Sequence, residues 1–64
     1  MSSVSVFRKN WDEVHGYTIE EAYTKKAKVD DAHGVGTPES KWNPAEILVD
    51  TTRKDGFMVV IRTK

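Results

Sequence analysis

The stretch Glu46–Lys64, EILVDTTRKDGFMVVIRTK, decides the fold of this chain. Two runs rich in β-branched residues, Ile47–Thr52 and Phe57–Ile61, flank the turn-forming sequence KDG at positions 54–56. Apolar runs that are separated by a short glycine-containing turn are typical of a β-hairpin. The stretch therefore predicts two antiparallel strands.

The loop length sets which residues of the two strands lie opposite each other. A two-residue loop would pair Asp50 with Ile61, whereas a three-residue loop (54–56) pairs Val49 with Ile61 and Ile47 with Thr63. We expect the three-residue loop, because it gives Gly56 the left-handed position and gathers the apolar side chains on one face. That core face comprises Ile47, Val49, Phe57, Val59 and Ile61.

The last strand has the character of a central strand, because Phe57–Ile61 is apolar on both faces. The alternating segment Ser2–Arg8 supplies a further strand to pair with it. On this strand we expect Val4 and Val6 to join the core face and Phe7 to lie on the opposite face.

A helix is predicted to begin at Thr18, because Thr18 and Glu21 have the spacing of a capping box. We expect this helix to end near Lys28. Its predicted apolar face consists of Ile19, Ala22, Tyr23 and Ala27.

The segment 29–42 reads as a long loop, punctuated by glycine and proline, that Trp42 pins back onto the core. Pro44–Thr51 also has helix-start chemistry and is the rival to the first hairpin strand. Its β-branched residues and the turn that follows favour the strand.

The order strand, helix, hairpin predicts a single small α+β domain over residues 1–64. If the last strand lies between the other two, the sheet has a split β-α-β arrangement, with the helix on one face. The second face is then open. We expect it to carry Phe7, Leu48, Met58 and Val60.

The composition narrows the function classes. The chain has 64 residues, no cysteine, and ten basic residues balanced by ten acidic ones. Disulfides and cysteine-bound zinc are therefore excluded, and no overall field favours nucleic acid or membranes. The apolar runs are far too short for a membrane span, and the N-terminus lacks a signal-peptide pattern, so we expect a cytoplasmic protein.

Catalytic chemistry has little support in the sequence. His15 lies near Asp12 and Glu13, and His33 lies near Asp30 and Asp31. A metal site needs three or four convergent ligands, so we expect no metal and no cofactor. The glycines match no phosphate-binding motif, and the chain does not read as an enzyme. An enzyme whose site is completed by a second subunit stays open.

Protein binding is the first functional hypothesis, because a small core without disulfides gains stability from a partner or from a homodimer. Trp11 can be a lid on the core edge or an exposed anchor for the partner. Chains of this size are also common among phage-encoded modulators of host enzymes, an association with length alone. The partner-binding candidates are Trp11, Trp42, Phe7, Met58 and Val60.

Nucleic-acid binding is the alternative hypothesis, because a basic β-hairpin can enter a major groove. It requires that basic residues from the hairpin and the helix gather on one side. Interspersed aspartates argue for an ordinary mixed surface instead. The candidates are Arg53, Lys54, Arg62, Lys25 and Lys28.

Overall fold

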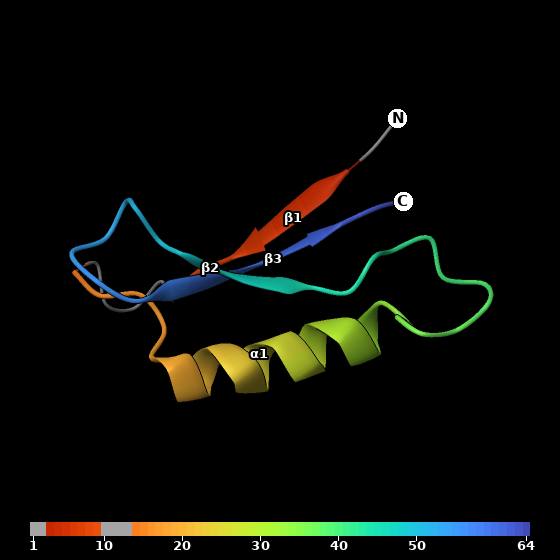
Figure 1. The fold of residues 1–64 in the computed structure, drawn as a ribbon, viewed down its shortest axis with the longest axis horizontal. Coiled ribbons are helices and arrows are strands. Elements are labelled where there is room, and N and C mark those ends of the chain that lie inside the picture. The colour runs from red at the N-terminus through yellow and green to blue at the C-terminus, as the bar shows by residue number, and fades with distance from the viewer. Residues whose placement is uncertain (1–2, 10–13) are drawn as a thin grey trace.

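The computed structural model describes residues 3–9 and 14–64. β3 lies between β1 and β2 and is antiparallel to both, so β1 and β2 run parallel to each other. The helix packs against β3 and β2 on one face of the sheet (Figure 1). The α+β class, the split β-α-β order and the central position of the last strand are confirmed. The elements are β1 (Val4–Phe7), α1 (Ile19–Ala32), β2 (Glu46–Val49) and β3 (Phe57–Arg62).

Helix α1 begins as predicted and ends later than predicted. The Thr18 hydroxyl accepts a hydrogen bond from the Glu21 amide at 3.2 Å, and the Glu21 carboxylate accepts one from the Thr18 amide at 3.0 Å. The helix continues past Lys28 to Ala32 and ends in a Schellman motif. In this motif Gly34 has φ +67°, and the Val35 amide donates to the Asp30 carbonyl at 3.0 Å.

The predicted apolar face of the helix is confirmed at Ala22 and wrong at its other three positions. Ala22 and Val29 are the buried positions, whereas Ile19, Tyr23 and Ala27 are exposed. Ala22 and Val29 lie two helical turns apart, which places them on the same side of the helix. The prediction ended the helix near Lys28 and therefore did not include Val29. The apolar face was for this reason assigned to a mostly wrong set of residues.

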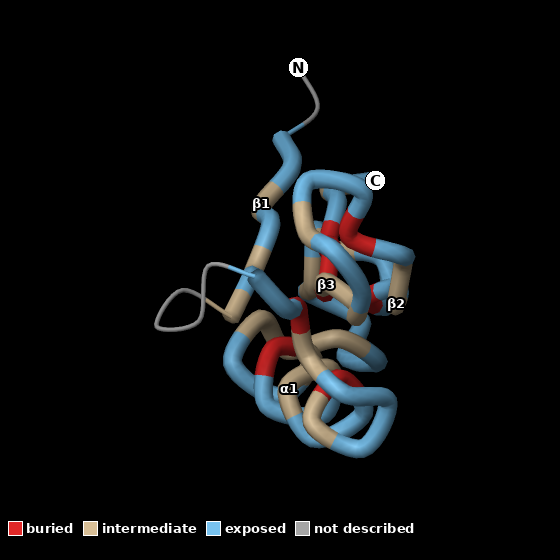
Figure 2. The backbone as a smooth tube through the Cα atoms, turned by 90° about the vertical axis from the view of Figure 1, so that its left-hand side faces the viewer, coloured by how far each residue is buried: buried red, intermediate tan, exposed pale blue. Residues whose placement is uncertain are grey.

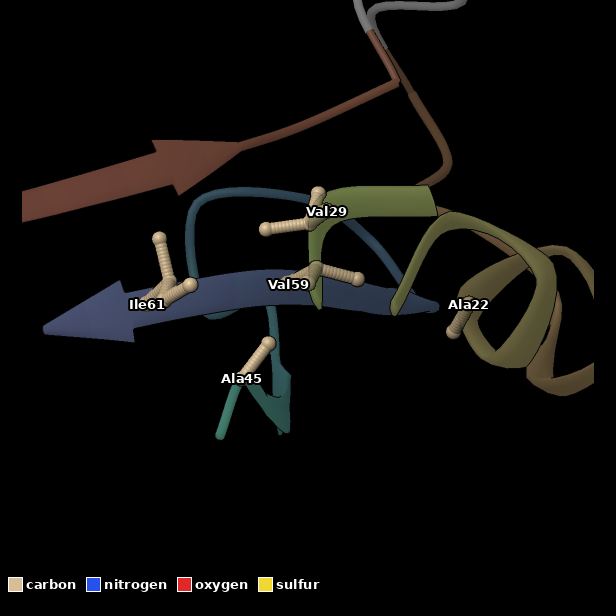
Figure 3. Close-up of a cluster of buried hydrophobic side chains, with 5 residues drawn as sticks. All are labelled: Ala22, Val29, Ala45, Val59 and Ile61. Atoms are coloured by element: carbon tan, nitrogen blue, oxygen red, sulfur yellow. The ribbon is translucent and has the colours of Figure 1, made fainter. Parts of the chain in front are cut away.

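The core lies between α1, β3 and the residue that precedes β2 (Figure 3). Trp42 packs against this cluster from the α1–β2 connection, so its predicted role in holding that connection on the core is confirmed. The rival helix over 44–51 is wrong, because β2 occupies its centre. The buried cluster comprises Ala22, Val29, Ala45, Val59 and Ile61.

The predicted hairpin register is also wrong. Ile47 lies opposite Val59 and Val49 lies opposite Phe57, so the connection covers residues 50–56 rather than two or three residues. Asp50 causes the difference, because its carboxylate accepts the Thr52 amide at 3.1 Å and turns the chain out of the strand. The shift is an even number of residues, so the predicted partition of side chains between the two faces survives.

Strand β1 has the opposite orientation to the one expected. Phe7 pairs with Val59 and packs against the core, whereas Val4 and Val6 are 55% and 45% exposed on the other face. No residue of β1 is buried, in contrast to β3 (Figure 2). The single large aromatic side chain buries more apolar area than either valine, which favours this orientation.

Candidate functional site

The sheet face that α1 does not cover is mainly apolar at its centre. Val6, Val60 and Glu46 lie side by side across the three strands, and Met58 lies opposite Leu48. Val60, between Val6 and Glu46, is only 3% exposed. We call this surface the open face. Its apolar members are Val4, Val6, Leu48, Met58 and Val60.

Charged residues surround the apolar centre of the open face. Arg62 and Glu46 form an ion pair at 3.3 Å at one end, and both side chains are about half exposed. Arg8 lies at the other end, where its guanidinium contacts the Met58 sulfur at 3.8 Å. An apolar centre within a polar rim is the usual anatomy of a protein-binding surface.

Asp50 is a buried charged residue at the Arg8 end of the open face. Its side chain is 0% exposed, and one carboxylate oxygen lies 3.5 Å from Arg8 Nε and 3.7 Å from Arg53 Nε. The other oxygen accepts the Thr52 hydroxyl at 2.6 Å. Burial raises the pKa of Asp50, but the Thr52 hydrogen bonds and the two arginines outweigh it, so the pKa lies below its usual value.

Strand β1 leaves one backbone edge without a strand partner in the described chain. The Thr63 amide donates to the Ser3 carbonyl at 2.9 Å, which identifies Ser3 as a position that bonds to β3. Hydrogen bonding alternates along an antiparallel strand, so Val4 and Val6 turn their N–H and C=O groups away from β3. These groups can accept an additional strand.

A groove runs between β1 and the side of α1. One part, with a volume of about 420 Å³, is lined by Phe7, Tyr17 and Lys25, among others. The adjoining part, of about 260 Å³, is lined by Phe7, Lys25 and Lys28 together with the last turns of the helix. Lys25 Nζ lies 5.0 Å from the centre of the Phe7 ring. We call this the β1–α1 groove; the inward orientation of Phe7, which the sequence did not reveal, places that side chain in it.

The residues that the sequence proposed for partner binding do not form one surface. Met58 and Val60 lie on the open face, whereas Phe7 and Trp42 pack on the helix side of the sheet. Trp11 lies outside the described residues. Val4 and Val6 complete the open face; the alternation of the strand was visible in the sequence, but its orientation was not.

The proposed nucleic-acid residues are also dispersed. Arg53 and Lys54 belong to the connection that precedes β3, and Arg62 lies at the far end of that strand. Arg53 and Arg62 form ion pairs with Asp50 and Glu46. The two helix lysines of the same hypothesis do lie together, because Lys25 and Lys28 line one groove.

The two histidines have structural contacts. His33 caps the helix, where its Nδ1 lies 2.8 Å from the Val29 carbonyl oxygen and its ring meets Trp42 edge-on at 4.6 Å. His15 contacts Asp55 through its Nδ1, while its sequence neighbours Asp12 and Glu13 lie outside the described residues. Within residues 3–9 and 14–64, no three histidine, aspartate or glutamate side chains converge on a point that could hold a metal.

Comparisons with protein families, with curated proteins and with solved structures find no match for this chain. In the part of the chain that the structure describes, no helix has the length and apolar character that crossing a bilayer requires. The functional argument therefore depends on the surfaces described above.

Proposed function

We propose that this chain is a non-enzymatic protein-binding domain and that the open face is its binding surface. The observation that carries the proposal is the exposure of Val4 and Val6 beside Leu48, Met58 and Val60, on a sheet face without a covering layer among the described elements. A sheet normally buries its apolar face against another element, so a partner would supply the missing layer.

A second copy of this chain is the partner to test first. A sheet face with an apolar centre and charges of both signs at its rim can pair with itself about a twofold axis. Self-association would also compensate for a core of only a few residues, which on its own supplies about 3–5 kcal/mol in a domain of this size.

The test compares two exposed valines from opposite faces by sedimentation equilibrium over a range of concentrations. Val6→Asp places a charge on the open face, and Val49→Asp places one on the helix side, where Val49 is 61% exposed. We expect Val6→Asp to raise the dissociation constant of the dimer by at least about tenfold and Val49→Asp to leave it unchanged.

A wild-type chain that remains monomeric at all concentrations would reject the homodimer. The same two variants then serve as matched baits with candidate partner proteins, including enzymes of a phage host. Equal binding by Val6→Asp and Val49→Asp would contradict the assignment of the open face.

Nucleic-acid binding is the second candidate function. It is favoured by the placement of Lys25 and Lys28 beside the aromatic rings of Phe7 and Tyr17, because single strands bind through cations and stacking surfaces. Its mark is a steep fall of affinity with salt, and affinity that does not change with salt would reject it.

A further inference from the structure

We infer that the free edge of β1 and the β1–α1 groove together accept an extended acidic segment of a partner protein. This site adjoins the open face but is distinct from it, and the inference does not require the open face to bind anything. Two independent features carry it: the unpaired backbone groups of β1 and the uncompensated charge of two lysines.

The backbone edge provides the first half of the site. Val4 and Val6 direct N–H and C=O groups away from β3, and these groups have no hydrogen-bond partner in the described chain. An extended peptide that pairs with them would continue the sheet beyond β1, with hydrogen bonds to the main chain supplying affinity. The neighbouring Arg8 carbonyl already accepts the Tyr17 hydroxyl at 3.4 Å, which limits the open edge at that end.

The lysines provide the second half. Lys9 and Lys26 are bound to Glu21 and Asp30, each at 2.9 Å. Lys25 and Lys28, in contrast, have no carboxylate within ion-pairing distance in the described chain, although both line the groove. Their charges favour carboxylates, and the third basic residue near this edge, Arg8, is paired with Asp50.

The pleat of the sheet predicts the pattern of the bound segment. Residues opposite Ser5 and Phe7 would point to the helix side, toward the groove, and residues opposite Val4 and Val6 would point to the open face. Side chains opposite each other on adjacent strands lie about 5 Å apart, so an acidic residue opposite Phe7 is within reach of Lys25. The segment therefore alternates acidic and apolar residues.

The position of Glu20 restricts where the acidic residues bind. Glu20 and Glu21 line a further part of the groove, with a volume of about 440 Å³, which Lys25 and Lys28 line as well. Glu21 is neutralised by Lys9, whereas no ion pair of Glu20 is present in the described chain. Acidic side chains are therefore expected beside the C-terminal half of α1, and a polyanion that covers the whole groove would meet Glu20.

The test uses a short, end-blocked, fluorescent peptide in which valine and glutamate alternate, and it measures anisotropy with the full chain. Lys25→Gln combined with Lys28→Gln should weaken binding by about tenfold. The matched control combines Lys41→Gln with Lys64→Gln, which removes the same charge from exposed lysines beside the C-terminal end of β3 and should change nothing. A valine–glutamine peptide should also bind more weakly.

Peptides with N-methyl groups on alternate amides separate strand pairing from charge attraction, since they keep the side chains and lose donors. Two such peptides are possible, one methylated at the odd-numbered amides and one at the even-numbered amides; we call these the two methylation phases. The phase that methylates the amides facing β1 should abolish binding. Leu48→Asp, on the distant strand of the open face, should leave peptide binding intact even where it disrupts the partner surface proposed above, so the two proposals can fail separately.

Four outcomes would overturn the inference. The first is peptide binding that is insensitive to loss of Lys25 and Lys28, and the second is binding that tolerates both methylation phases. The third is oligothymidylate binding to the same lysines more tightly than the peptide, which would assign the groove to nucleic acid. Absence of binding by the alternating peptide at low salt would reject it as well.

Discussion

The β2–β3 connection and the longer α1–β2 connection are each anchored by one aspartate, yet they are built differently. In the β2–β3 connection, Asp50 is buried and contacts two arginines. In the α1–β2 connection, Asp30 is partly exposed; it accepts the Ala45 amide at 2.8 Å and pairs with Lys26 at 2.9 Å. Both aspartates accept a backbone amide, but only Asp50 holds its charge away from water.

The surroundings of the two anchors differ further. The β2–β3 connection is fixed by close backbone contact, since Gly56 packs directly on Gly16. The α1–β2 connection is fixed by several separate bonds, such as Thr37 Oγ1 to the Gly34 carbonyl at 2.8 Å and Ser40 Oγ to the His33 carbonyl at 3.1 Å. A short connection concentrates its stability in a few positions, and a long one spreads it, so substitutions should be costly in the first and mild in the second.

The largest difference is expected between Gly56→Ala and Gly34→Ala. A Cβ at Gly56, where φ is +100°, would lie 2.6 Å from the Gly16 backbone, whereas a Cβ at Gly34 meets its nearest atom at 3.6 Å. Gly56→Ala should cost about 4 kcal/mol from strain and overlap combined, enough to unfold most of the protein. Gly34→Ala should cost about 1 kcal/mol.

Urea denaturation followed by far-ultraviolet circular dichroism measures both variants. Similar midpoints for the two would mean that the β2–β3 connection can relax around the added methyl group, and the contrast between the connections would be lost.

A smaller difference is expected between Asp50→Asn and Asp30→Asn. Asparagine can still accept the amide of Thr52 or Ala45, so each variant mainly removes charge. Asp50→Asn should cost about 2–3 kcal/mol, because a buried amide group would replace the charge that the two arginines contact. Asp30→Asn should cost about 0.5–1 kcal/mol, because its pair with Lys26 is partly solvated. The same urea titrations decide, and equal costs would show that burial of Asp50 adds nothing.

The smallest effect is expected in the dependence of stability on pH, at acidic pH. The Asp30 pKa is raised by burial, but the bonds from Lys26 and Ala45 more than offset this and leave it below the ordinary 3.8, as for Asp50. A lowered folded-state pKa stabilises the protein above the unfolded-state value, and this stability is lost as the pH falls through the folded-state pKa. The amide proton shifts of Thr52 and Ala45 should therefore titrate with midpoints below 3.8. A midpoint above 3.8 at either amide would contradict the contribution of its anchor.

The sequence predicted the order and pairing of the strands because those depend on residue type. The capping box at Thr18 and the apolar run of β3 are local signals. The predicted hairpin register is wrong because Asp50 turns the chain out of β2 through its bond to the Thr52 amide. The sequence did not reveal that Asp50 is buried beside Arg8, which comes from the N-terminal part of the chain. The helix end was predictable in principle, since glycine is the usual residue just after the C-cap in a Schellman motif and Gly34 occupies this position.

The candidate site was less predictable than the fold. Val4 and Val6 alternate with Phe7, and alternation alone cannot tell which set faces the helix. The β1–α1 groove depends on the orientation of β1 and on which face of the helix is buried. The orientation of β1 and most of the buried helix face were predicted wrongly from the sequence. Met58, Val60 and Leu48 were assigned to the open face correctly, because side chains alternate along each strand and the error in the hairpin register was an even number of residues.

The position of β3 in the middle of the sheet has a consequence for synthesis of the chain. Among the residues that the structure describes, β1 and β2 both pair only with β3, which follows them in sequence. While the ribosome is still making β3, neither earlier strand has its partner, and α1 does not yet have the surface that buries Val29. The domain is therefore expected to fold only after β3 has left the ribosomal tunnel, with pairings that are mostly long-range and correspondingly slow to form.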